Sequence, residues 1–398
     1  MLDWFTQLLW GWHVLLLLLG AGAYFTAATG FYQVRCLGRW LGAALASRRK
    51  EEGGRLSSFQ ALTAALAGSL GTGNIVGVGV AIATGGPGAL FWMWVSALLG
   101  MMTVYAENVL AARHRQAPGA LGYIRAAGRW GKPLAAVYAG GCCLSSLGMG
   151  TMAQTNSAAA SLSTLGVPVA VSALGLGLLA FWVARGGLAL GAKITQRLVP
   201  LMTLLFFGAS LWVLWVFREN IPRAVASIFQ GAFSLKAGAG GAAGALLALR
   251  TGVSRGVFTN EAGLGSSAFA YQGVEGRSPE ELGCLGIFQV FVDTLVMCTV
   301  TGLCILCCRS PVLEGGNWRS TPLKAPWAPG AGGWPPCARR CSPWPPWWPG
   351  AAGAGKGCST LPAAGEEPPM PWRRGRPRPW GACCPWGLCS SWGTPATG

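Results

Sequence analysis

The chain has 398 residues, of which 52% are hydrophobic and only 11% are charged. Its charged fraction is roughly half that of a typical soluble domain. Several apolar runs reach the ~20 residues that a helix needs to cross a bilayer, which indicates a polytopic membrane protein. The formal net charge is +17. In a soluble protein this charge would favour nucleic-acid binding, but here the basic residues cluster between apolar runs and form no basic soluble domain.

Residue types that support metal or acyl-transfer chemistry are scarce. The only histidines are His13 and His114, so a Ser-His-Asp triad is not expected. The cysteines of the first 308 residues lie in or beside apolar runs, where cysteine packs as a small hydrophobe, and none has zinc-site spacing. We therefore expect no enzyme, no metal site and no cofactor.

Eight apolar segments before residue 309 are predicted to span the membrane as helices. They cover residues 8–30, 58–84, 88–112, 133–160, 167–184, 194–217, 225–249 and 281–307. The fifth is short and the seventh is interrupted by glycines. Residues 1–309 thus read as one all-α membrane domain.

The loops between these segments alternate in charge. Six Arg or Lys residues follow the first segment within 35–55, and five follow the third within 113–132, whereas the loop 85–88 has none. Because positive loops stay in the cytoplasm, the pattern predicts an N-terminus outside the cell membrane.

The second segment contains Gly71-Thr72-Gly73-Asn74 near its midpoint. Glycines make a helix easy to unwind, and an unwound turn inside a membrane is tolerated only beside protein or a water-filled cavity. Such a turn exposes amides and carbonyls, which is how transporters hold an ion and a small polar substrate. The sequence therefore predicts a broken helix here.

A similar glycine-rich stretch, residues 238–244, interrupts the seventh segment. Two broken helices of opposite direction, five spans apart, are typical of an inverted repeat. We expect Gly240, Gly241 and Gly244 to line the wall opposite the first break. The alternative is that these small residues only allow close helix packing.

Residues 310–398 differ in composition from the rest. They contain half of the 20 tryptophans, most of the prolines, and no Phe, Tyr, Ile, Asp, His or Gln. One interpretation is a proline-rich disordered tail. The other, suggested by the richness in Trp, Arg and Cys, is a GC-rich coding region translated out of frame after about residue 309.

Several motifs resemble the alanine or glycine:cation symporter family, also called sodium:alanine symporters. The segment GGPGALFWMWVSALLG at 85–100 resembles the family signature. The segments GTGNIVGV at 71–78, GMGTMAQTNS at 148–157, GVFTNEAGLGSSA at 256–268 and FVDTLVMCTVTGL at 291–303 are similar to other parts of the family. The resemblance covers residues 1–309. It implies a LeuT-like fold of two inverted five-helix repeats after one extra helix, of which this chain would have an incomplete second repeat.

The resemblance also implies a substrate and ion site at the first break. The amides of Thr72, Gly73 and Asn74 suit an amino-acid carboxylate, because a half-helix start carries positive dipole. Gln154 and Asn156 could reach this cavity, although interhelical hydrogen bonding is at least as good an explanation. The Asn74 side chain could serve the ammonium or an ion, or simply be a satisfied polar residue in a helix break.

Sodium is expected as the co-transported cation. Analogy with LeuT-like carriers nominates the carbonyls of Ala67 and Leu70 as ligands. Their usual partners come from a later helix that falls outside the resemblance, so the sodium site of this chain would be incomplete.

Two acidic residues lie within predicted spans. Asp293 is near the middle of the eighth, where a carboxylate is functional by default, and ion relay and structural pairing are both open. Glu107 is expected to snorkel beside Arg113. The segment Thr259-Asn260-Glu261 reads as a capping or gating loop.

The sequence thus predicts a secondary transporter that couples sodium or proton flow to uptake of alanine or glycine by alternating access. The alternative is an inactive remnant of such a carrier. A channel is disfavoured, because paired broken helices differ from a ring of filter residues. The expected partners are the amino acid, sodium and the lipid bilayer.

Overall fold

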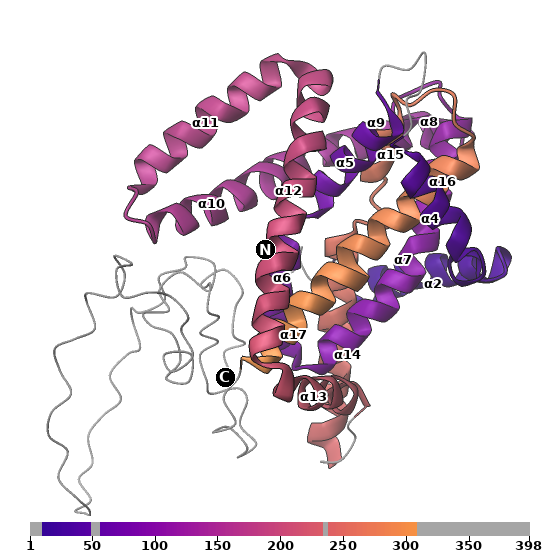
Figure 1. Ribbon diagram of the computed structural model, residues 1–398. Helices are drawn as coiled ribbons and strands as arrows, with labels where there is room; N and C mark the ends of the chain where they lie inside the picture. The colour runs from indigo at the N-terminus through magenta and orange to yellow at the C-terminus, as the bar shows by residue number, and fades with distance from the viewer. Residues whose placement is uncertain (1–9, 49–55, 234–237, 309–398) are drawn as a thin grey trace, which may run out of the picture. The chain divides into compact units, whose positions relative to one another are not determined.

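The computed structural model describes residues 10–48, 56–233 and 238–308, and these residues form helices and no strands (Figure 1). The predicted all-α membrane class is therefore confirmed for the described part of the chain. Four helices there are long and apolar enough to cross a membrane, and one bent pair adds a fifth. Two further apolar helices, α2 (Trp12–Ala28) and α11 (Val169–Arg185), are shorter. The tail at 310–398 lies outside the described residues.

The second predicted span is a broken helix, as expected. The helix α5 (Ser58–Ser69) starts with a capping box, in which Ser57 and Gln60 satisfy each other's backbone N–H groups. A single 3₁₀ turn, η1 (Thr72–Asn74), follows, and then α6 (Val76–Gly85). The segments before and after the break are bent by 56°. Extended backbone at Gly71 (φ −135°, ψ −152°) makes the bend.

The helix α7 (Gly88–Arg113) is the element against which the others pack most closely. On one side lies α14 (Gly238–Asn260). It runs parallel to α7, as two successive contacts show: Gly252 packs on Ala89, and Gly256 packs on Ser96. These glycines let the two backbones approach closely.

On another side of α7, the helix α16 (Pro279–Val290), the π-helix η4 (Phe291–Cys298) and α17 (Thr299–Cys307) form one continuous span. This span is antiparallel to α7, since Gly286 packs on Val104 and Gly302 on Leu90.

The remaining long helices bury little of their surface within the described chain. The span made of α9 (Gly131–Ser145), the π-helix η2 (Ser146–Met152) and α10 (Ala153–Ser163) is 6% buried over its most apolar window. The helix α12 (Gly187–Val216) is 11% buried, against 56% for α7. In Figure 1, α10 and α11 extend away from the other helices. Apolar side chains that face outward in this way suit contact with lipid tails.

The seventh predicted span, 225–249, is wrong. Its residues are shared between α13 (Ile221–Phe233), an amphipathic helix that buries Ala224, Ile228 and Ala232, and α14. The glycine stretch 238–244 does not interrupt α14, which stays helical from Gly238 to Asn260. The alanines at 239, 242 and 243 favour a helix among these glycines. Glycines further along α14 serve close packing. Residues 234–237, where a break between the two helices would fall, lie outside the described residues.

Short helices cover the ends of the spans. They are α3 (Tyr32–Arg35), α4 (Leu37–Ala46), α8 (Ala120–Arg125), η3 (Arg218–Asn220) and α15 (Ser266–Tyr271). The helix α4 packs on α16, and the Trp40 side chain, 1% exposed, contacts the rings of Phe288 and Phe291. These contacts hold α4 against the junction of α16 and η4.

Candidate functional site

The break in α5–α6 holds a polar side chain from another helix. Gln154, at the start of α10, accepts a hydrogen bond from the Thr72 amide through Oε1 (3.3 Å). The same side chain lies so close to Gly71 that a Cβ there would be 2.6 Å from Nε2. The structure therefore brings Gln154 and the Thr72 amide together, as the sequence suggested. Asn156, two residues later, is exposed.

A buried polar pair lies beside the break. The Asn74 side chain donates from Nδ2 to the Asp293 carboxylate (2.7 Å) and to the Asp293 carbonyl (2.9 Å). Asn74 is 1% exposed and Asp293 is 0% exposed. The second carboxylate oxygen accepts from the Thr294 hydroxyl (2.9 Å).

This pair is rich in acceptors and poor in positive charge. Within the described residues, the Asn74 Oδ1 atom is buried without a hydrogen-bond donor, and no Lys or Arg forms an ion pair with Asp293. An uncompensated carboxylate at this depth is costly. The arrangement therefore favours a bound cation.

The break also changes the backbone hydrogen bonds of α5. The Gly71 amide donates to Ser69 (2.8 Å) and the Asn74 amide to Gly71 (3.3 Å). In a continuous helix these amides would donate to the carbonyls of Ala67 and Leu70. Both carbonyls nominated as ion ligands thus lose their regular donors, which is a precondition for binding a cation.

Two π-helical segments flank the site. The segment η2 ends one residue before α10, where Gln154 sits, and η4 carries Asp293. A π-helix widens the turn and re-aims the side chains that follow, and such segments are frequent at functional sites.

The opposite wall comes from the end of α14. A Cβ on Gly73 would lie 3.5 Å from Thr259 Oγ1 and 3.9 Å from the Phe258 ring. The Thr259 hydroxyl donates to the Arg255 carbonyl (2.7 Å). The break and the last turn of α14 therefore face each other with room for about one methyl group at Gly73.

The prediction that Gly240, Gly241 and Gly244 line this wall stays a prediction. They belong to the first two turns of α14, at least 15 residues before Thr259, which is about 22 Å along a helix. Nothing lies within 4 Å of the Cβ position at Gly244. The sequence argument assumed that the glycines mark the break, whereas the helix approaches the site only at its last turn.

Sequence reasoning left the role of Asp293 open and did not single out Phe258. Asp293 could be flagged as a mid-span acid, but its pairing with Asn74, 219 positions away, depends on helix packing. Phe258 lies in the motif GVFTNEAGLGSSA, which is the signal that could have identified it.

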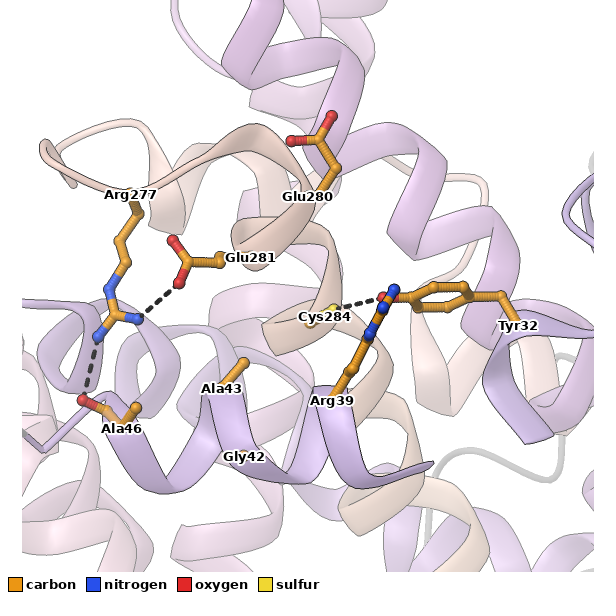
Figure 2. A pocket seen from close by; sticks show the side chains of 9 residues that line it. All are labelled: Tyr32, Arg39, Gly42, Ala43, Ala46, Arg277, Glu280, Glu281 and Cys284. Atoms are coloured by element: carbon orange, nitrogen blue, oxygen red, sulfur yellow. Dashed lines mark hydrogen bonds and ion pairs between the residues drawn. The ribbon is translucent and has the colours of Figure 1, made fainter. Parts of the chain in front are cut away.

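A surface pocket lies elsewhere in the described part of the chain. It has a volume of about 380 Å³ and lies between α4 and the start of α16 (Figure 2). Figure 2 shows Arg277 directed at Glu281 (3.2 Å) and at the Ala46 carbonyl (3.0 Å). Glu280 pairs with Arg113 (2.7 Å). Because these charges already have partners, we place the candidate site at the break.

Comparisons with known proteins identify the family of this chain. The profile of the sodium:alanine symporter family matches residues 1–323. The chain is 39% identical over 306 residues to the sodium/alanine symporter AgcS of Methanococcus maripaludis, covering 74% of this chain and 67% of the relative.

It is also 36% identical over 316 residues to the probable sodium/glutamine symporter GlnT of Bacillus subtilis, covering 75% of this chain and 64% of the relative. An uncharacterized transporter of Haemophilus influenzae is 40% identical over 312 residues, covering 75% and 67%. The chain thus spans about two thirds of the length of these relatives. It belongs to the sodium:alanine symporter family, a family of transporters and not of enzymes.

Proposed function

We propose that this protein is an amino-acid:cation symporter of the cell membrane, which couples inward sodium flow to uptake of alanine or glycine. The observation that carries the proposal is the break between α5 and α6, where the Gln154 side chain of α10 accepts a hydrogen bond from the Thr72 amide and a buried Asn74–Asp293 pair lies alongside. A single unwound turn with these neighbours offers both signs of charge that a zwitterion and a cation need.

The amino-acid carboxylate would bind at the amides of η1. The Thr72 amide now donates to Gln154 Oε1, an acceptor that a carboxylate can replace. Gln154 would then turn its own amide group toward the substrate. The Gly73 amide follows in η1, just before the start of α6, where the helix dipole favours negative charge. The Asn74 amide would have to leave the Gly71 carbonyl to join it.

The cation would bind beside Asp293. Sodium prefers hard oxygen ligands, and the described residues offer the Asp293 carboxylate, the unpartnered Asn74 Oδ1 and the carbonyls of Ala67 and Leu70 released by the break. A proton on Asp293 is the alternative driving cation, because one protonated oxygen would also neutralise the buried charge.

Substrate size would be limited by the end of α14. A single added Cβ at Gly73 would already be in contact with the Phe258 ring and the Thr259 hydroxyl. This wall favours a small side chain, although the relative GlnT is named a probable sodium/glutamine symporter.

The packing of the broken helix against α14 supports a LeuT-like inverted repeat and alternating access. The helix α6 is antiparallel to α14, since Gly85 meets Ala248 and Gly73 meets Thr259. Two helices of opposite direction around one site could rock against each other and expose it to each side in turn. With the basic loops in the cytoplasm, the N-terminus is outside.

Uptake of labelled alanine into proteoliposomes tests the proposal. We expect saturable uptake that requires an inward sodium or proton gradient and is competed by glycine more strongly than by glutamine. No uptake above protein-free liposomes would identify the chain as an inactive remnant. Uptake that does not saturate and ignores the gradient would identify a pore.

A further inference from the structure

The turn between α14 and α15 has a backbone that few residues adopt easily. Glu261 has a φ of +55°, Gly263 of +92° and Gly265 of +68°. This turn begins directly after Thr259 and Asn260, the residues that end α14. Its conformation therefore sets where the last turn of α14 lies.

Glu107 of α7 holds this turn from the side. Its Oε1 atom accepts a hydrogen bond from the Gly265 amide (3.2 Å), and the residue is only 8% exposed. The expected snorkelling beside Arg113 is wrong, since Arg113 pairs with Glu280. Within the described part of the chain, Glu107 Oε2 is buried and has no hydrogen-bond partner.

Neighbouring contacts hold the same turn in place. The Tyr138 hydroxyl of α9 donates to the Leu264 carbonyl (2.7 Å), and the Ser267 hydroxyl donates to Asn108 Oδ1 (2.9 Å). Asn260 Oδ1 accepts from the Ala262 amide (3.0 Å), which confirms the predicted capping role of Asn260. Glu107 is the carboxylic acid in this set.

The turn is connected to the broken helix through one turn of α14. Thr259 and Phe258 lie on one side, where a Cβ on Gly73 would touch them. On the other side, Asn260 packs so closely on Gly100 of α7 that a Cβ there would be 2.9 Å from Nδ2. A shift of the turn at 261–265 would therefore move the wall that faces the break.

We propose that Glu107 is a positioning residue for transport, which fixes the turn 261–265 and through it the wall of the amino-acid site. The expected effect of Glu107 on alanine binding rests on the proposed function, whereas its effect on the turn 261–265 does not. A carboxylate is suited to this role because it only accepts hydrogen bonds, and the turn presents backbone amides to it.

Hydrogen exchange of the full chain in nanodiscs tests this coupling without requiring transport. In Glu107→Ala we expect amides in 261–267 and in 70–75 to exchange about tenfold faster. In Glu107→Gln, which keeps the Oε1 acceptor, the change should stay below about threefold. The control is Glu280→Gln, which removes a carboxylate from an exposed ion pair and should leave both segments unchanged.

Faster exchange only in 261–267 would show a local structural role and overturn the proposal. Equal acceleration throughout α16 and α17 would also overturn it, because it would mean general destabilisation. In uptake assays, Glu107→Ala should raise the KM for alanine at least threefold and leave the KM for sodium unchanged, and Glu107→Gln should restore it. If the wild-type chain takes up no alanine, the proposed function fails, and the exchange experiment still decides the role of Glu107.

Discussion

Replacing Asp293 with asparagine tests whether its carboxylate binds the driving cation. Asparagine has the same shape, and its carbonyl oxygen can keep the hydrogen bond from Asn74 Nδ2. Its amide would then face the Thr294 hydroxyl, which can accept as well as donate. We therefore expect the substitution to lower the free energy of unfolding by about 1 kcal/mol or less.

The effect on the cation should be larger. A contact to a charged group is worth ~1.5–3 kcal/mol, which corresponds to about 10- to 150-fold in affinity. We expect the KM for sodium to rise by a factor in this range at saturating alanine. The KM for alanine at saturating sodium should change less than about threefold, because the Thr72 amide and Gln154 remain in place.

Two measurements on purified protein check this: initial rates of alanine uptake at varied sodium, and the rise of Tm with sodium concentration. Glu280→Gln is a matched control, since it removes a carboxylate from the same helix, about 20 Å from Asp293 and half exposed. A folded Asp293→Asn protein with wild-type sodium dependence in both assays would refute the reasoning.

Three further substitutions test separate parts of the structure. Gly71→Ala places a Cβ 2.6 Å from Gln154 Nε2, so we expect it to displace that side chain and raise the KM for alanine about fivefold, measured by uptake. Gly22→Ala brings a Cβ to 2.8 Å from a backbone oxygen of α7, so we expect it to lower the free energy of unfolding by about 1–3 kcal/mol in thermal unfolding. The control is Gly20→Ala in the same helix, whose Cβ meets nothing within 4 Å and should leave the stability unchanged. Burial raises the pKa of Glu261, which lies between α14 and α15, so the folded chain binds its proton more tightly than the unfolded chain does. Its contribution to stability is then greatest in acid and falls as pH rises above the usual glutamate pKa of about 4.3, so Glu261→Gln should flatten the decline in Tm over that range.

Hydropathy and loop charge were enough to place most of the helices. The described helices fall within a few residues of seven predicted spans, because each apolar run ends at glycines, prolines or basic residues that also end the helix. The break at 71–74 was predictable for a related reason. Two glycines within three residues, Gly71 and Gly73, lower the helix propensity at this point of the span.

The glycine stretch at 238–244 shows the limit of that reasoning. Glycine in a membrane helix can mark a break or a close packing surface, and the two have the same local sequence. What decides between them here is the neighbour. The helix α14 lies along α7, where Gly252 and Gly256 allow contact, and it continues through Arg250 and Arg255 beyond the end of the apolar run. Neither fact can be read from residues 225–249 alone.

The two buried acids have different partners, and this difference separates their proposed roles. Glu107 receives its hydrogen bond from a backbone amide in a turn with little conformational freedom, so releasing it requires the turn to move. Asp293 receives its hydrogen bonds from the side chains of Asn74 and Thr294, which a change of rotamer can withdraw. A carboxylate with exchangeable donors can bind and release a cation in each transport cycle, whereas one bound to backbone amides can only hold a position. A carrier needs both kinds of carboxylate. Coupling requires that the cation be released in each cycle, and specificity requires that the wall around Gly73 keep its position.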